Sequence, residues 1–375
     1  FRRRTTMSTI MKRWCLLSAA AALVGARTLP VRHEPFAALE HVNLNVGDEW
    51  TPELESFFLS VLRCTSDPRA RAILNRTNDA RDDDAPAMGD LRWINVGLQQ
   101  FHLPINDNLG GPSVQSLRGD VALAWPRDKL PGLRRRLEAW LDDYGGGMDV
   151  GEAESLSFVG PNDMRFEIEA SDSGDWFGPV ARFDAARDAP PGGPSEGLGI
   201  RAVRLDVPKG TAAKICRFYA EIFEADVELS SKTHRRRERQ TCVLFVGFHQ
   251  SLEFRETDAA LPYEGAHVAL YVNFKKFVSA YYRARHLVFH NPRSPQFSFD
   301  TIDDVLSHDE FRFKDIIDLD TGDTVYELEH EIRALSHQGF TLKHRLPGDD
   351  NDDDDDNDTR SRTTAAAPPL AFKAW

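Results

Sequence analysis

The chain has 375 residues, of which 41% are hydrophobic and 10% aromatic, enough for two ordinary domains that each bury a core. Its formal net charge is −13, and eight of these negative charges are aspartates of the segment 349–358. The remainder, about −5, disfavours nucleic acid as a partner, because nucleic-acid binding needs a basic surface.

The N-terminal segment 1–30 has the order of a targeting signal. A basic pair at 12–13 precedes the apolar stretch 14–24, and small residues follow at 25–26, as in a secretory signal peptide. The apolar stretch is too short to span a bilayer, so no stable membrane insertion is expected. The segment predicts entry into the secretory pathway or a plastid, and the alternative is a cytoplasmic protein with a basic leader.

The region 36–184 is predicted to form a first domain of strands and helices. Residues 39–46 alternate between apolar and polar side chains, as in a half-buried strand. One apolar helix face follows, made of Leu54, Phe57, Phe58, Val61 and Leu62. The pattern then predicts strands at 93–96 and 98–104 around Gly97, a strand at 119–124, a helix near 131–141, and a strand at 165–169.

The region 198–340 repeats this pattern and is predicted to form a second domain. At a shift of 161 residues the strand 39–46 lies over 200–207, and the first helix lies over a second apolar face around residues 215–223. Later segments repeat in the same order, so the unit strand, helix and three strands occurs four times. The Pro- and Gly-rich segment 185–197 is a predicted linker, and 346–375 is a predicted acidic disordered tail.

Three cysteines remain after the leader: Cys64, Cys216 and Cys242. Their odd number and dissimilar surroundings argue against a disulfide framework. Cys64 and Cys216 fall in or at the end of apolar helices, where buried thiols are expected.

The fourfold βαβββ pattern resembles the vicinal oxygen chelate superfamily, which includes glyoxalases, bleomycin resistance proteins and extradiol dioxygenases. The resemblance covers residues 39–170 and 198–332. It implies an α+β fold with two glyoxalase-like domains, in which paired units form curved, cup-like sheets. It also implies that metal ligands point into each cup from the first and last strands of the units.

The ligand positions that this resemblance implies are His41, His102, Asp120 and Glu167 in the first copy, and Glu253, His267 and Glu327 in the second, with Ala202 at the remaining position. Imidazole and carboxylate without thiolate suit Zn, Ni, Mn or Fe, so a divalent metal is the expected cofactor. For a carboxylate inside an apolar strand, such as Glu167 or Glu327, the alternative partner is a basic residue, Arg204 or Arg165.

Two pairings of the units leave the composition of the site open. If each copy closes on itself, His41, His102, Asp120 and Glu167 share one site, and Glu253, His267 and Glu327 share another. If the first unit pairs with the fourth, one site contains His41, His102, His267 and Glu327. The remnant site then contains Asp120, Glu167, Ala202 and Glu253, with no imidazole.

The resemblance implies a divalent-metal enzyme that acts as a lyase or isomerase on a small molecule with adjacent oxygens, with Glu327 or Glu253 as the base. An Fe(II) extradiol-type dioxygenase is one alternative, for which His41, His267 and Glu327 supply two imidazoles and one carboxylate. A non-catalytic small-molecule-binding or structural module is the other, because Ala202 and Asp120 depart from the family pattern. Fusion of two copies in one chain is compatible with a monomer.

Overall fold

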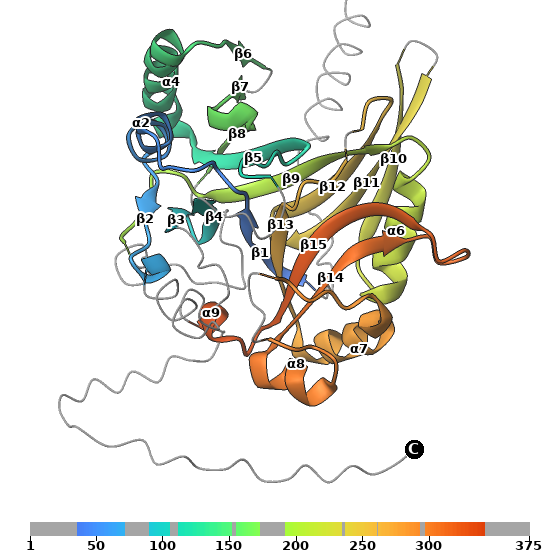
Figure 1. Cartoon of the computed structure of the whole chain (residues 1–375). Helices are drawn as coiled ribbons and strands as arrows, with labels where there is room; N and C mark the ends of the chain where they lie inside the picture. The colour runs from blue at the N-terminus through green and yellow to red at the C-terminus, as the bar shows by residue number, and fades with distance from the viewer. Residues whose placement is uncertain are drawn as a thin grey trace, which may run out of the picture.

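The computed structural model describes residues 36–71, 90–105, 112–151, 155–172, 192–234, 237–260, 262–292 and 297–341. The predicted targeting segment and the predicted acidic tail lie outside these residues, as does most of the predicted linker. Within the described part of the chain, the strands form two sheets, and helices lie on their outer sides (Figure 1). No helix in this part is both long and apolar enough to cross a membrane.

The first sheet joins the beginning of the chain to its end. In spatial order its seven strands are β14 (Glu310–Ile317), β15 (Thr324–Ala334), β13 (His267–Val272), β1 (Phe36–Asn43), β4 (Gln99–Ile105), β3 (Asp90–Val96) and β2 (Thr65–Ser66). The junction between the two copies is the antiparallel pair of β1 and β13, in which His41 lies opposite Ala269 and Asn43 opposite His267.

The second sheet is formed by the middle of the chain. Its eight strands, in spatial order, are β10 (Val227–His234), β11 (Arg237–Gly247), β12 (Gln250–Thr257), β9 (Gly199–Pro208), β5 (Gly119–Pro126), β8 (Arg165–Ser171), β7 (Leu156–Val159) and β6 (Met148–Val150). Its junction is the antiparallel pair of β5 and β9, in which Asp120 lies opposite Arg204.

Each unit begins with a strand and a helix whose apolar face packs into the core. The helical segments are α2 (Pro52–Glu55) and the π-helix η1 (Ser56–Val61), η2 (Arg127–Lys129) and α4 (Leu130–Tyr144), η4 (Pro161–Asp163), α6 (Ala212–Ile222), α7 (Phe274–Ala284), η5 (Arg285–Leu287), α8 (Ile302–His308) and α9 (Gln338–Thr341). In α4, for example, Leu133, Leu137 and Trp140 are buried and share one face.

The fourth unit departs from the βαβββ order. Between α7 and β14 it has the second helix α8, and only one strand, β14, precedes β15 among its described residues. Val288 makes an isolated antiparallel bridge to Phe313, so a short extended segment lies beside β14 in place of the missing strand.

The predicted α+β class, with four strand-and-helix units in two sheets, is confirmed. The structure has the second of the two pairings, because the first unit shares a sheet with the fourth and the second with the third. Each sheet therefore contains strands of both copies. The boundaries predicted for two separate domains, 36–184 and 198–340, stay a prediction.

The two sheets are joined by a buried glutamine. The side chain of Gln250 accepts a hydrogen bond from the backbone N–H of Leu39 and donates to the carbonyl oxygens of Leu39 and Ile200. Leu39 belongs to the first sheet and Ile200 to the second. These hydrogen bonds connect the backbones of β1 and β9 through one buried side chain.

The prediction that Cys216 is a buried thiol is wrong. Cys216 on α6 and Cys242 on β11 form a disulfide with a Cα–Cα distance of 5.5 Å. Their sequence contexts differ because one belongs to a helix and the other to the strand on which it packs, and only the fold brings them together. Cys64 is a buried free cysteine, as predicted.

Candidate metal centre

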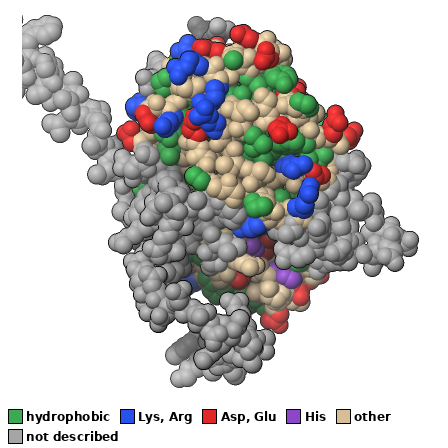
Figure 2. Space-filling model, turned by 90° about the vertical axis from the view of Figure 1, so that its left-hand side faces the viewer, with side chains coloured by type: hydrophobic (Ala, Val, Ile, Leu, Met, Phe, Trp, Pro, Cys, Tyr) green, Lys and Arg blue, Asp and Glu red, His purple; other side chains and the backbone are tan. Residues whose placement is uncertain are grey.

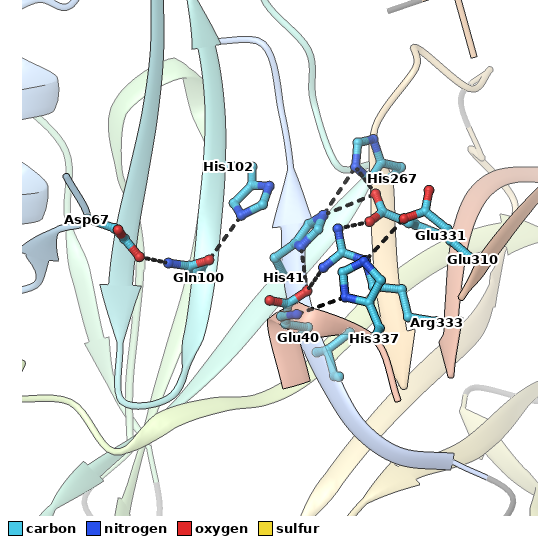
Figure 3. A network of polar contacts seen from close by, with 12 residues as sticks. Glu40, His41, Asp67, Gln100, His102, His267, Glu310, Glu331, Arg333 and His337 are labelled. Carbon is cyan, nitrogen blue, oxygen red and sulfur yellow. Dashed lines mark hydrogen bonds and ion pairs between the residues drawn. The ribbon is translucent and has the colours of Figure 1, made fainter. Parts of the chain in front are cut away.

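Two predicted ligand residues and one carboxylate that was not predicted lie close together on one face of the first sheet. His41 comes from β1, His267 from β13 and Glu331 from β15, and all three side chains are buried. Among the described residues, they form the one group of three metal-ligand side chains whose ligand atoms lie within 4.8 Å of one another. Figure 3 shows their side chains pointing toward a common centre.

The geometry of this group fits a metal ion. The Nε2 atoms of His41 and His267 are 3.2 Å apart, and Oε2 of Glu331 lies 3.7 Å and 3.5 Å from them. A triangle with these sides has a circumscribed radius of about 2.0 Å, which matches the length of a Zn–N bond. One cation can therefore lie at bonding distance from all three atoms at once.

Neighbouring side chains orient two of these groups. Nδ1 of His41 lies 3.2 Å from the carboxylate of Glu40, so it carries the proton and Nε2 presents its lone pair to the centre. Burial lowers the pKa of His41 more strongly than Glu40 raises it, which keeps the imidazole neutral. Arg312 donates to Oε2 of Glu331 at 2.5 Å, and Arg333 forms an ion pair with Oε1.

The buried groups around this centre carry more negative than positive charge. The described cluster contains four carboxylates and two guanidinium groups, namely Glu40, Glu310, Glu329 and Glu331 with Arg312 and Arg333. Burial and the nearby Glu331 raise the pKa of Glu310 to about 7, whereas for Glu331 the two arginines outweigh the effect of burial and hold its pKa well below the usual range. When Glu310 is ionised, the carboxylates exceed the guanidinium groups by two charges, which a divalent cation would balance.

His102 belongs to the same face but not to this group of three. Its ring stacks on that of His41 with 3.7 Å between centroids, and on its other side it stacks on Trp93 at 4.4 Å. Its Nε2 lies 3.1 Å from Oε1 of Gln100, and Gln100 donates to Asp67 (Figure 3). The structure thus places the ring of His102 between those of Trp93 and His41, where it packs against a predicted ligand.

The register places Glu331, not Glu327, beside the two histidines. In β13 and β15 His267 is aligned with Glu329, and Glu331 follows two residues later on the same face. Glu327 lies four residues earlier, where its carboxylate pairs with Lys314 at 2.6 Å. Alternation along β15 leaves Glu327, Glu329 and Glu331 equivalent in sequence, because all three point to the same face, so only the strand register distinguishes them.

The same register rule holds in the other three units. The last-strand residue lies two positions beyond the partner of the first-strand residue, which gives the matched pairs His41 with His102, Asp120 with Glu167, and Ala202 with Glu253. His41, His102, His267 and Glu331 of the first sheet therefore correspond to Ala202, Glu253, Asp120 and Glu167 of the second.

The corresponding centre of the second sheet is built around an arginine. The guanidinium group of Arg204 contacts all three of the remaining carboxylates, Asp120, Glu167 and Glu253. This is the salt-bridge alternative considered for Glu167. Glu253, the second candidate base, lies in this centre and not beside His41 and His267, and the base roles of Glu253 and Glu327 stay predictions.

The space-filling view shows part of the surface near the first sheet. Histidine side chains are visible there beside basic ones, below a broader area where acidic, basic and hydrophobic side chains alternate (Figure 2).

No protein-family model matches the chain, and no curated protein matches its sequence. Solved structures similar to it include glyoxalase I from Zea mays, with 12% identity and a TM-score of 0.44 over 79% of this chain and 92% of that one. A putative dioxygenase from Bacillus subtilis has 10% identity and a TM-score of 0.45, over 84% of this chain and 92% of its own.

A smaller similar structure is a mutant of the fosfomycin resistance protein FosX from Listeria monocytogenes, in complex with Mn(II) and 1S,2S-dihydroxypropylphosphonic acid. It has 12% identity and a TM-score of 0.24, and the match covers 36% of this chain and 92% of that one. All three are members of the superfamily that the strand pattern resembles. At these identities and TM-scores, no residue role or activity is carried from them to this chain.

Proposed function

We propose that the chain binds one divalent cation between His41, His267 and Glu331, and acts with it on a small molecule that carries adjacent oxygen atoms. The observation that carries this proposal is the triangle of 3.2, 3.5 and 3.7 Å between the three ligand atoms. These atoms come from three strands of one sheet, and the surplus of buried carboxylates around them favours a cation.

The residues around the centre would prepare it for binding. Glu40 keeps the proton of His41 on Nδ1, and Arg312 and Arg333 fix the carboxylate of Glu331 without occupying both lone pairs of Oε2. When bound, the cation would act as a Lewis acid on the oxygen atoms of the substrate. The first reaction class that we propose is therefore that of a lyase or isomerase, as in glyoxalase I.

A second reaction class is supported by the composition of the centre. Two imidazoles and one carboxylate are the ligands of many non-haem Fe(II) oxygenases, and His41, His267 and Glu331 form such a set. An extradiol-type dioxygenase would bind Fe(II) and consume O₂. The lyase or isomerase would bind Zn, Ni or Mn and consume none, so the two classes differ in metal and in oxygen uptake.

The first test is the metal content of the purified full-length chain, measured by elemental analysis after dialysis against each metal in turn. We expect one metal per chain, and His41→Ala, His267→Ala and Glu331→Gln should each lose it. The matched control is Glu327→Gln, which removes a carboxylate from the same strand face but one that pairs with Lys314.

The outcomes separate the alternatives. Loss of the metal in Glu327→Gln but not in Glu331→Gln would contradict the assignment of the ligands. A wild-type chain without metal would favour the non-catalytic binding module. If the metal is present, activity on hemithioacetals of α-ketoaldehydes supports the isomerase class, and O₂ uptake with catechols supports the dioxygenase class.

We also propose that the mature chain resides in an oxidising compartment, reached through the N-terminal signal. Structural disulfides form in secreted and lumenal proteins and are rare in the cytosol, and Cys216 and Cys242 are bonded. Fusion of the full chain to a fluorescent protein would test this proposal, and fluorescence in the cytosol would contradict it.

A further inference from the structure

The centre of the second sheet lacks a histidine where the first sheet has His41. The strand register makes Ala202 on β9 the equivalent of His41 on β1, and a methyl group cannot ligate a metal. Arg204 lies two residues further along β9, on the same face as Ala202, and its side chain pairs with the carboxylates at the other three positions.

The guanidinium group of Arg204 is surrounded by carboxylates. Its nitrogen atoms lie 3.3 Å from Asp120, 2.6 Å from Glu169 and 3.5 Å from Glu253, and a fourth ion pair joins it to Glu167. The arginine side chain is 14% exposed, whereas the four carboxylates are 17 to 31% exposed. The cation thus lies deeper than the anions that surround it.

Each of these four carboxylates is paired with a guanidinium group. Burial lowers the pKa of Arg204, but Glu253, Asp120 and Glu167 together raise it above its ordinary value, so the group is always charged. Arg255 pairs with Asp120 at 2.5 Å and with Asp206 at 3.4 Å. Asp120, Glu167 and Glu253 do not belong to any described group of ligand atoms within 4.8 Å, as expected if a guanidinium group separates them.

We propose that Arg204 is the resident cation of the second centre, where it takes the place that a divalent metal takes in the first. The second centre then binds no metal in the natural chain, and Arg204→Ala converts it into a site for one divalent cation held by Asp120, Glu167 and Glu253. The comparison with a metal in the first centre rests on the proposed function, but the claim about the second centre does not.

The two centres differ in the metal that they would favour. Three carboxylates offer only oxygen, which suits Mn²⁺ or Ca²⁺. The first centre offers two imidazoles, which suit Zn, Ni or Fe(II). Mn²⁺ is therefore the probe for the uncovered second site, because its binding is measured directly by electron paramagnetic resonance.

The experiment uses the full-length chain with His267→Ala, so that the state of the first centre does not affect the count. In this background we expect Arg204→Ala to bind one Mn²⁺ per chain at submillimolar concentration. Addition of Glu167→Gln to this variant should weaken binding by about tenfold or more. The matched control is Arg201→Ala, which should bind none. It removes a guanidinium group from the same strand, one that pairs with Glu169 and donates to the carbonyl oxygen of His249.

Two results would overturn the proposal. One is a folded Arg204→Ala chain that binds no Mn²⁺ at millimolar concentration. The other is a His267→Ala chain that already holds a cation and loses it in Glu167→Gln. If the Arg204→Ala chain does not fold without metal, it is refolded with and without millimolar Mn²⁺. Folding only in the presence of Mn²⁺ supports the proposal, and a chain that stays unfolded under both conditions contradicts it.

Discussion

The imidazole of His102 lies between two other rings, those of His41 and Trp93, with interplanar angles of 20° and 8°. Stacking uses the faces of the ring and does not involve its nitrogen atoms. Its nitrogen contact to Gln100 turns Nε2 toward the chain of polar groups that leads to Asp67. In this arrangement His102 stacks on His41 and limits its orientation, although its strand position equals that of Glu331.

We therefore predict that His102→Phe keeps the metal of the first centre. Phe retains the stacking area but offers no ligand atom, so the metal affinity should fall by less than about tenfold. His102→Ala, which removes the stack, should weaken binding more. Equilibrium dialysis measures both, and complete loss of metal in His102→Phe would show instead that His102 is a ligand, as the family resemblance implies.

His330 titrates far from its ordinary range because it lies on the opposite, helix-covered face of the sheet. Its Nδ1 donates to the carbonyl of Leu328 at 2.6 Å, and its Nε2 accepts from the hydroxyl of Tyr219 at 2.6 Å. The ring stacks on Phe313 at 4.2 Å. Burial lowers its pKa to about 3, against the opposing effect of the Leu328 carbonyl.

This shift predicts a loss of stability in acid. In the unfolded chain the imidazole takes up a proton below its ordinary pKa of about 6.5, whereas in the folded chain it stays neutral down to about 3. Above pH 6.5 the imidazole is neutral in both states and does not change the free energy of unfolding. This free energy falls as the pH drops from 6.5 toward 3, because only the unfolded chain takes up the proton. Between pH 7.5 and 5 this group alone should cost about 2 kcal/mol.

Urea unfolding at both pH values, with a chelator present, measures this loss. The variant His330→Gln does not titrate, so the difference between the two pH values should shrink by about 2 kcal/mol relative to the wild type. The control His286→Gln changes an exposed histidine, and the difference should stay close to that of the wild type. An unaltered pH dependence in His330→Gln would contradict the assignment.

At the scale of elements, the junction of β5 and β9 depends on one residue without a side chain. A Cβ atom on Gly119 would lie 1.7 Å from the carbonyl oxygen of Arg204, which belongs to the backbone and cannot turn away. Gly119→Ala should therefore force the two strands apart and lower the free energy of unfolding by about 3 kcal/mol or more.

Denaturant titration measures this effect, and Gly147→Ala is its control, because a Cβ at Gly147 meets no atom within 4 Å. Equal stability of the two variants would show that β5 and β9 do not approach as closely as described.

A second feature that links two elements is the disulfide between α6 and β11. It closes a loop across a sequence separation of 26 residues. Because the bond reduces the entropy of the unfolded chain, it should stabilise the fold by about 3.5 kcal/mol. Mass spectrometry of the unreduced full-length protein should find Cys216 and Cys242 linked. Cys216→Ser should lower the unfolding free energy by about that amount, and a wild-type protein whose thiols all react with an alkylating reagent would contradict the bond.

At the scale of the whole molecule, neither copy holds a complete sheet. Separation of the chain at the linker would leave β1 without β13 and β5 without β9, which are the central pairs of both sheets. An open sheet edge of buried strands is unstable in water. The first and last strands of the chain thus depend on each other.

We predict that fragments 36–184 and 198–340 do not fold as separate monomers. When mixed or co-expressed they should form a one-to-one complex. Size-exclusion chromatography and circular dichroism of each fragment and of the mixture provide the measurement. A fragment that unfolds cooperatively as a monomer would instead favour closure of each copy on itself.

The sequence by itself determined the repeating units and most of their strands. Alternation placed the strand at 39–46 within three residues of β1, and the apolar faces of the helices were correct because such periodicity follows directly from backbone geometry. It also singled out His41 and His267, whose Nε2 atoms lie 3.2 Å apart in the structure. Strands β2, β6, β7, β10 and β14 and the disulfide were not predicted.

The tertiary structure decided which units share a sheet and which carboxylate reaches the histidines. Both pairings of the units satisfy the same local patterns, and they differ in contacts between distant residues, such as His41 with His267 and Asp120 with Arg204. Along β15 a period of two makes Glu327 and Glu331 alike, so their roles depend on the register with β13. Register and pairing are set by the packing of the whole core, which no local stretch of sequence contains.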